Sequence, residues 1–317
     1  MMNPRNPASR IVTGLPLVAL LAAFGCGGGD QSGRPGGGTG TGSGAGKPDA
    51  RARKVVIQNI GSDTMVNVAQ EWSAEYKKVA PNVSVEVGGG GSGVGIKSLM
   101  DGLTDIANAS RDMKASEKEL ARKNTGKDPV ETIVGYDAIG IYVHKDNPLT
   151  EISAEDLAGI YGEAKAITKW SQLGVTIPGG RDEIVVVSRQ NSSGTYAFFR
   201  EHILKNKDFR MGMQSMSGSK DVVDLVSKTP GAIGYSGMGY KTDEVKFVNV
   251  SARKGEKAYG PSIGTVRDKT YPLARSLNMY TLGAPQGEVQ KYIAWVLSAD
   301  GQKIVEKAGY VPIEAGK

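Results

Sequence analysis

The residues best suited to chemistry form one stretch, Ser188-Arg189-Gln190-Asn191-Ser192-Ser193-Gly194-Thr195. The β-branched run 184–187 before it predicts a buried strand, and the apolar spacing over 196–204 predicts a helix after it. A cation and several hydroxyls thus stand at the start of a helix, where free backbone N–H groups and the helix dipole favour an anion. Arg189 adds a planar fork of donors that matches tetrahedral oxyanions. The alternative is an ordinary N-cap serine beside a surface arginine.

Further polar loops follow other predicted strands. Residues 54–60, 83–87 and 105–109 have strand patterns, and the loops after them are Gly61-Ser62-Asp63-Thr64, the glycine-rich run 88–95 that contains Ser92, and Ser110-Arg111. Apolar residues at helical spacing follow the first two loops. Strand, loop and helix in repeated order are typical of a parallel α/β sheet. Ligands of such sheets lie beyond the carboxyl ends of the strands, where these loops fall.

Two long β-rich runs, 131–144 and 273–281, frame a second α/β set that contains the Arg189 loop. Two long strands separated by a whole set of elements predict two lobes and a chain that crosses between them twice. The apolar spacing over 289–308 predicts a helical C-terminal part. The length left after the N-terminal segment is enough for two lobes with a substantial core.

The formal charge of +6 is concentrated at the N-terminus. Residues 1–54 carry seven basic and two acidic side chains, while the remaining 263 residues carry 32 basic and 31 acidic ones. The folded part is therefore close to neutral. The sequence pI of about 9.1 gives no argument for a nucleic-acid partner, and we expect none.

Motifs for nucleotide binding and catalysis are weak or missing in the sequence. The run 88–93 satisfies G-x-G-x-x-G, but a glycine run satisfies almost any such pattern, and Ile96 stands before the lysine that a P-loop requires. His144 and His202 come with no nucleophile motif, and no G-x-S-x-G occurs. No cluster has metal-ligand spacing, so we expect neither a metal nor a cofactor. Hydroxyls, loop amides and arginines suit binding better than turnover.

The first 25 residues predict a secretory signal peptide. A basic segment, 1–10, precedes an apolar run, 11–24, that is too short to span a membrane comfortably. Cys26 is the only cysteine and directly follows this segment, as the lipid-bearing cysteine of a bacterial lipoprotein would. Cleavage by an ordinary signal peptidase, which leaves a free thiol, is the alternative. The glycine-rich stretch 26–54 predicts a flexible tether behind a lipid anchor on Cys26.

Several stretches resemble the phosphate-binding proteins that feed bacterial phosphate ABC importers. Four resemble ligand loops of that family and two resemble other parts of it: 61–64, 91–95, 105–111 and 189–195, then 231–235 and 271–273. The similarity covers residues 55–313. It implies an α/β, two-lobed type II periplasmic-binding-protein fold with two crossover hinge strands. Lobe I would span 55–138 and 268–317, and lobe II would span 139–267.

The resemblance also implies which residues bind phosphate. Arg189 would pair with the oxygens, and hydroxyls and loop amides would donate to them. The best-known branch of the family has an aspartate near Ser110 that accepts the phosphate proton, and this chain has a serine and an arginine there. Either Asp63 takes that role or selectivity against sulfate is weaker; otherwise Asp63 only caps a helix. The expected ligand set is Ser62, Asp63, Thr64, Ser92, Gly93, Ser110, Arg111, Arg189, Ser193, Gly194 and Thr195.

The function that the resemblance implies is extracytoplasmic capture of inorganic phosphate. A lipid-anchored monomer, in the periplasm or at the outer face of a membrane, would deliver the ion to the permease subunits of an ABC importer. Two alternatives stay open. One is a receptor for another tetrahedral oxyanion, sulfate or molybdate, or a sensor without a permease, and the other is a secreted phosphatase with Ser193 as its nucleophile.

Overall fold

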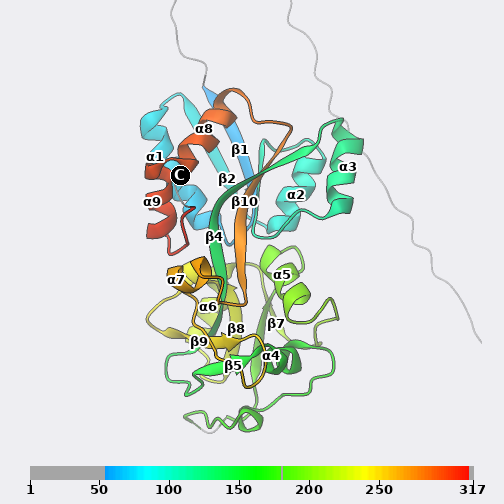
Figure 1. Ribbon diagram of the computed structural model, residues 1–317, viewed down its shortest axis with the longest axis vertical. Helices are drawn as coiled ribbons and strands as arrows, with labels where there is room; N and C mark the ends of the chain where they lie inside the picture. The colour runs from blue at the N-terminus through cyan, green and yellow to red at the C-terminus, as the bar shows by residue number, and fades with distance from the viewer. Residues whose placement is uncertain (1–53, 180, 314–317) are drawn as a thin grey trace, which may run out of the picture. The chain divides into compact units, whose positions relative to one another are not determined.

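The protein is seen here as a computed structural model that describes residues 54–179 and 181–313. The predicted signal peptide, Cys26 and all but the last residue of the predicted tether lie outside the described residues. The described chain forms two α/β halves joined by two long strands (Figure 1). We refer to the half that contains the first three strands as lobe I and to the other half as lobe II.

Lobe I repeats the order strand, loop, helix. Its strand 83–88 alternates the buried Val83 and Val85 with more exposed residues, and its helices bury one apolar face, as the spacing predicts. The first three strands are β1 (Val55–Gly61), β2 (Val83–Gly88) and β3 (Ile106–Ala109), and β1 pairs in parallel with both others. The helices are α1 (Val66–Val79), α2 (Ser92–Met100) and α3 (Ala115–Thr125), joined at the C-terminal end of the chain by α8 (Gly287–Leu297) and α9 (Ala299–Lys307).

Two antiparallel strands, β4 (Pro129–His144) and β10 (Ala274–Leu282), pass from one lobe to the other. β10 also pairs with β3 in antiparallel sense, so the sheet is mixed rather than parallel as the loop pattern predicted. The reason is topological, because β10 returns from lobe II and enters the sheet of lobe I from the opposite direction. The expected two crossings of the chain are these two strands.

Lobe II continues the sheet through β4 to β8, β6 and β7, with β9 pairing β4 and β5. Its strands are β5 (Glu151–Ser153), β6 (Val185–Arg189), β7 (Gln214–Met216), β8 (Ala232–Gly237) and β9 (Val245–Ser251). Its helices are α4 (Ala154–Tyr161), α5 (Gly194–His202), α6 (Ser219–Ser227) and α7 (Ile263–Arg267), with short 3₁₀ turns η1 (Trp170–Leu173) and η2 (Met238–Tyr240).

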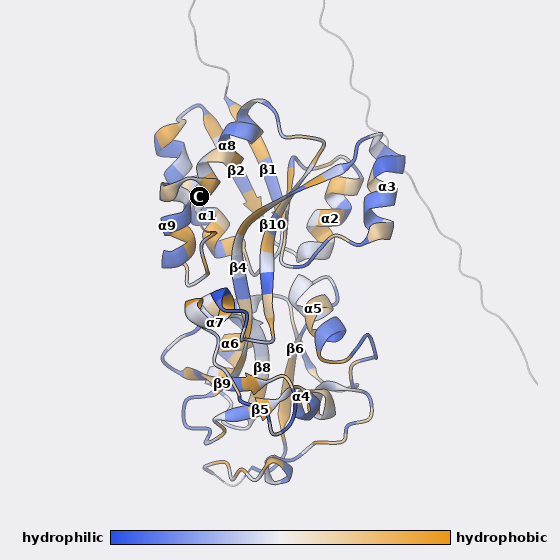
Figure 2. Ribbon diagram, viewed as in Figure 1, coloured by the Kyte–Doolittle hydropathy of each residue, from blue (hydrophilic) through white to orange (hydrophobic). Residues whose placement is uncertain are grey.

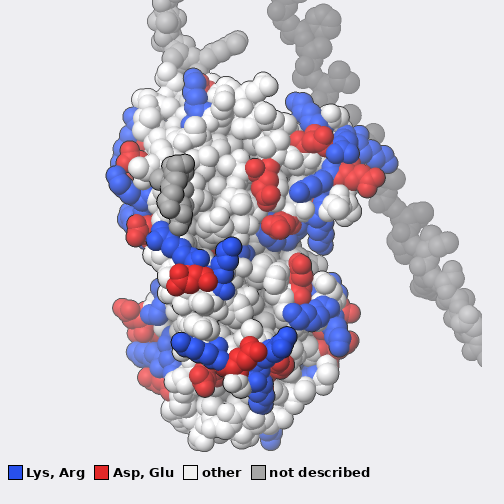
Figure 3. Space-filling view, viewed as in Figure 1, with Lys and Arg blue, Asp and Glu red and all other residues white. Residues whose placement is uncertain are grey.

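Each lobe has its own apolar core. The lobe I core packs α1, α8 and α9 against the sheet around Trp72 and Tyr292, and the lobe II core gathers around Tyr161, Trp170 and Tyr235. Along α8 and α9, hydrophobic and hydrophilic residues alternate, whereas α3 is mainly hydrophilic (Figure 2). On the face that Figure 3 shows, basic and acidic side chains are interspersed over both lobes. None of the helices in the described ranges has the length and apolar character that a membrane span needs.

Trp72→Ala tests the lobe I core. The Trp72 side chain is fully buried, and its indole N–H donates to the Gly301 carbonyl at 2.8 Å, which joins α1 to α9. We expect a loss of about 3–5 kcal/mol in the free energy of unfolding, measured with urea by circular dichroism. Leu103→Ala is the control, since Leu103 is 72% exposed, and it should change that free energy by less than about 0.5 kcal/mol. Equal small effects of both substitutions would contradict this account of the core.

Candidate functional site

Three strand-to-helix turns meet where the lobes face each other. β1 ends at Gly61, and the Ser62-Asp63-Thr64 turn leads into α1; a glycine loop leads from β2 into α2; and residues 190–193 lead from β6 into α5. Ser193 is the N-cap of α5, because its Oγ accepts from the backbone N–H groups of Thr195 and Tyr196 at 3.1 and 3.4 Å. The positive ends of three helices therefore point toward one region.

Five buried hydroxyl side chains gather in that region, and we call them the hydroxyl cluster: Ser62, Thr64, Ser92, Ser110 and Thr195. Ser62 Oγ donates to Ser110 Oγ at 2.8 Å, and Ser92 Oγ lies 3.3 Å from the same atom. The Ser110 backbone N–H donates to Ser92 Oγ at 3.0 Å. Thr64 Oγ1 of lobe I lies 3.0 Å from Thr195 Oγ1 of lobe II. The cluster therefore joins residues from both lobes.

The lobes approach so closely at the cluster that glycine is required. A Cβ atom on Gly194 would lie 2.3 Å from Ser92 Oγ and 2.8 Å from Ser110 Oγ. The Gly93 N–H of lobe I donates to the Ser192 carbonyl of lobe II at 2.9 Å. In this closed arrangement the start of α5 packs directly against the start of α2, and the Gly93 N–H is used in the contact between the lobes.

Arg189 is a buried cation at the end of β6. Its side chain is 1% exposed, and Nη1 donates to Ser219 Oγ at 2.8 Å. Nη2 donates to the Ser217 carbonyl at 2.9 Å and to Asp63 Oδ2 at 3.0 Å. Burial lowers the pKa of the guanidinium, and the Asp63 charge opposes that shift. Within the described chain, Nε is buried without a hydrogen-bond partner, so this arginine keeps at least one unused N–H donor.

Asp63 links the two lobes through its carboxylate. Oδ2 accepts from Arg189 of lobe II, while Oδ1 accepts from the Gly90 backbone N–H of lobe I at 2.9 Å. The Asp63 carbonyl accepts from the Tyr240 hydroxyl at 2.6 Å. The carboxylate is 17% exposed, so it lies at the edge of the buried region. The Asp63 carboxylate therefore accepts hydrogen bonds from the glycine loop and from Arg189, and the residue also lies just before α1.

A second buried arginine, Arg275, was missed by the sequence reasoning. It lies on β10 directly opposite Asp137 of β4, and its Nη2 and Nε donate to Asp137 Oδ2 at 2.7 and 3.0 Å. Burial raises the pKa of Asp137, and the charge of Arg275 opposes the shift. Arg275 Nη2 also donates to the Thr64 and Thr195 hydroxyls at 3.2 and 3.0 Å. A partial signal was present, since the predicted run 273–281 carries a single charge, Arg275, while the run 131–144 carries two acidic residues, Glu131 and Asp137.

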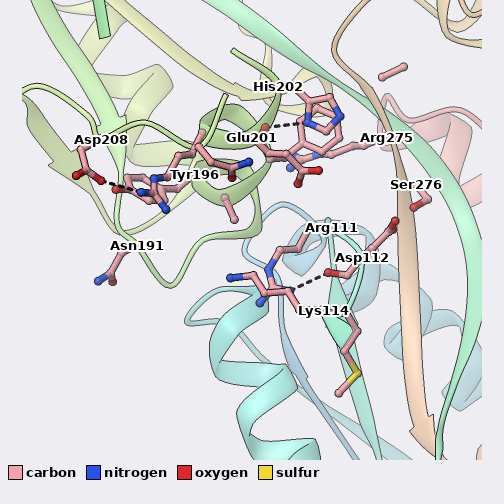
Figure 4. A pocket seen from close by; sticks show the side chains of 16 residues that line it. Arg111, Asp112, Lys114, Asn191, Tyr196, Glu201, His202, Asp208, Arg275 and Ser276 are labelled. Carbon is pink, nitrogen blue, oxygen red and sulfur yellow. Dashed lines mark hydrogen bonds and ion pairs between the residues drawn. The ribbon is translucent and has the colours of Figure 1, made fainter. Parts of the chain in front are cut away.

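Arg111 points away from the hydroxyl cluster. Its guanidinium binds Glu117 through two hydrogen bonds of 2.8 Å each, and Glu117 also accepts from the Lys114 N–H at the start of α3. Arg111 lines an outer groove of about 830 Å³ between the lobes, drawn in Figure 4, whose walls include α5 and residues 274–276. His202 lines the same groove, stacked on Phe198 with ring centroids 3.7 Å apart.

The structure thus places every residue of the expected set except Arg111 at or beside the hydroxyl cluster. Ser62, Thr64, Ser92, Ser110 and Thr195 form the cluster itself, Ser193 and Gly194 start the helix against it, and Arg189 and Asp63 form an ion pair at its edge. No group of three His, Cys, Asp or Glu side chains in the described ranges could hold a metal ion.

Comparison with known proteins identifies the class of protein to which this architecture belongs. A family model for a PBP superfamily domain matches residues 37–300. The phosphate-binding protein PstS of Pseudomonas aeruginosa is 33% identical over 269 residues, which are 82% of this chain and 83% of that protein. The two-lobed fold with two connecting strands is therefore that of a type II periplasmic substrate-binding protein, as the sequence predicted.

Solved structures agree with that class. A candidate phosphate ABC transporter substrate-binding protein from Clostridium perfringens, solved with bound phosphate, has a TM-score of 0.70 and 29% identity, and covers 82% of this chain and 100% of that one. An ABC-type phosphate transport receptor from Vibrio cholerae has a TM-score of 0.64 and 26% identity, with coverages of 81% and 100%. The chain belongs to the family of PstS phosphate-binding proteins.

Gly194→Ala tests the close approach of the lobes, with inorganic phosphate as the probe because the relatives are named for it. The added methyl group would meet the hydroxyls of Ser92 and Ser110, so we expect calorimetry to show phosphate affinity about 10-fold or more weaker. Gly264→Ala in α7 is the control, because its Cβ would have only an ordinary contact. Unchanged affinity in Gly194→Ala would mean that this approach of the lobes is not the one that binds the ion.

Proposed function

We propose that the protein captures inorganic phosphate between its lobes and delivers it to the permease of an ABC importer. The observation that carries this proposal is the convergence of hydroxyls from both lobes on a region edged by Arg189, whose buried Nε has no acceptor among the described residues. Such a donor set suits a tetrahedral oxyanion. The names of the PstS relative and of the two solved structures agree with phosphate as the ion.

The proposed ligands are hydroxyls and amides, with one guanidinium. Arg189 would bind the ion through its unused Nε, and the hydroxyl cluster and the Gly194 N–H would donate to its other oxygens. Ser193 contributes by capping α5, and its own hydroxyl proton stays free to donate because its Oγ accepts from the backbone. Arg111 is left out of the set, because Glu117 holds it on the outer groove.

An enzymatic role is not proposed. The family consists of substrate-binding transport proteins rather than enzymes, so the phosphatase alternative with Ser193 as nucleophile is dropped. The local geometry agrees, since Ser193 Oγ is engaged as a helix cap.

The two lobes would close around the ion by bending β4 and β10. We place lobe I at residues 55–138 and from 274 onward, and lobe II at 139–273. The second boundary differs from the expected residue 268, because Tyr271 and Leu273 pack in the lobe II core and the Tyr271 hydroxyl donates to the Ile139 carbonyl at 2.7 Å.

The place of action would be outside the cytoplasm. The basic and apolar N-terminal segment supports export, and Cys26 directly after it supports a lipid anchor with 26–54 as the tether. A tethered monomer would carry the ion to the permease subunits while it remains near the membrane. Treatment of cells with a label for lipid-bearing cysteines, compared with Cys26→Ser, would test the anchor.

Asp63 is the proposed reader of the phosphate proton. Its carboxylate stands beside Arg189 at the edge of the cluster and can accept a proton that phosphate carries and sulfate lacks at neutral pH. The same carboxylate repels an ion that has no proton to offer. This single group would set the selectivity among tetrahedral oxyanions.

Arg189→Ala is expected to weaken phosphate binding by about 2–5 kcal/mol, because the buried ion loses its charged partner. Isothermal calorimetry on the purified protein measures the change. Arg122→Ala is the matched control, since Arg122 is an exposed guanidinium paired with Asp128, and it should leave the affinity unchanged. Unchanged affinity in Arg189→Ala would remove this arginine from the site.

Asp63→Asn is expected to relax the rejection of sulfate. The ratio of the sulfate to the phosphate dissociation constant should fall by about 10-fold or more, because the amide neither repels sulfate nor accepts as a carboxylate does. Competition binding with sulfate and molybdate measures it, with Asp101→Asn on the lobe I surface as control. A parallel fall in both affinities would show that Asp63 is only structural.

A further inference from the structure

Arg275 contacts the hydroxyl cluster but is not one of the proposed phosphate ligands. It is 1% exposed, and Asp137, its partner on β4, is 0% exposed. The two residues face each other in register on the two strands that join the lobes. Asp137 Oδ1 accepts from the Met238 N–H at 3.0 Å, which fixes the carboxylate. Asp137, on the other connecting strand, therefore holds the Arg275 guanidinium in one position.

The other donors of Arg275 reach both lobes. Nη1 donates to the Ser110 carbonyl of lobe I at 3.0 Å, and Nη2 donates to the hydroxyls of Thr64 in lobe I and Thr195 in lobe II. The guanidinium carbon also lies 5.9 Å from the ring centroid of Phe198, one turn further along α5. A single planar group thus contacts the first turn of α5 and the loops of lobe I together.

The chemistry of these bonds fixes the direction of the hydroxyl protons. A guanidinium only donates, so neither threonine proton can point toward Arg275; one N–H of Nη2 goes to Asp137, and the two threonine oxygens share the other. The two oxygens lie 3.0 Å apart, and one threonine can donate to the other. That bond uses one threonine proton, so at least one other is left to point into the hydroxyl cluster. Both protons point there when an anion competes for the bond between the threonines.

We propose that Arg275 is a positioning residue for the anion. Held by Asp137, it orients the Thr64 and Thr195 hydroxyls as donors and keeps these two residues of different lobes next to each other. Its own charge is balanced by Asp137, so its effect on the ion is transmitted by these hydroxyl dipoles. This inference rests on the proposed function, because it concerns the same ion.

The test is a double-mutant cycle between the ion pair and Thr195, read as phosphate affinity by calorimetry on the full chain. Arg275→Met alone would leave a buried carboxylate unpaired, so the pair is replaced together as Arg275→Met with Asp137→Leu, a change that proteins often tolerate. We expect this variant to bind phosphate roughly 30-fold more weakly. Thr195→Val should cost roughly 10-fold in the native background but less than about 3-fold in the pair variant.

The controls separate the possible failures. Arg200→Met with Asp208→Leu replaces an exposed Arg–Asp pair on and beside α5 and should change affinity by less than about 2-fold. Arg275→Lys keeps the charge next to Asp137 but lacks the fork, and we expect it to lose roughly 10-fold, which serves if the double replacement does not fold. Affinity of the pair variant or of Arg275→Lys within about 3-fold of the native protein, or effects that simply multiply in the cycle, would overturn the proposal. Absent binding by the native protein would instead refute the proposed function.

Discussion

Under the proposed function, the protein has to bury an anion without an excess of positive charge. Arg189 and Arg275, the two cations at the hydroxyl cluster, are each paired with an aspartate, so the four groups have no net charge. A buried charge is costly unless donors surround it. The stabilisation of the proposed ion would therefore come from oriented dipoles: hydroxyls, loop amides and the first turns of three helices. Everything else in the fold has to bring those dipoles to one place.

The chain meets this demand by repeating one local device. Each of β1, β2 and β6 is followed by a loop that contains small or hydroxyl residues and leads into a helix, so every repeat supplies N–H groups, hydroxyls and a helix start together. The repeats belong to different lobes, and β4 and β10 set the distance between them. Glycine at 194 lets α5 approach Ser92 more closely than any residue with a Cβ atom could. The tight contact between the lobes and their connection by two hinge strands thus both follow from the need to bring these dipoles to one place.

Local features of the site could be predicted from the sequence, and long-range pairings could not. The stretch 188–195 is contiguous, and its strand, cap and helix start follow from residue types, as found. The pairing of Asp63 with Arg189 spans 126 residues, and that of Asp137 with Arg275 spans 138, so both depend on the register of the folded sheet. The two lobes were visible in the spacing of the long strands, whereas the antiparallel entry of β10 followed only from where the chain returns.

Arg111 shows how a neighbour can redirect a residue that a motif places in a site. Ser110, next to it in the sequence, lies in the hydroxyl cluster, but Glu117 stands at the third position of α3, where its carboxylate accepts from the Lys114 N–H. That capping carboxylate is six residues away and binds the guanidinium with two hydrogen bonds. The local energetics of a helix start therefore decide the direction of Arg111, and no pattern in the loop itself contains that information.

The two ion pairs are unequal, and the difference bears on how selectivity can arise. Asp137 is fully buried beneath Arg275, with a pKa raised by desolvation, and it lies on the hinge strands, screened from the cluster by the guanidinium. Asp63 is 17% exposed, and each of its oxygens has a single protein donor, which leaves lone pairs free. Of these two aspartates, Asp63 is therefore the one proposed to meet a proton on an incoming ion. In the proposed scheme the hinge pair would orient donors and the edge pair would read protonation, because a carboxylate that discriminates must remain within reach of the ligand.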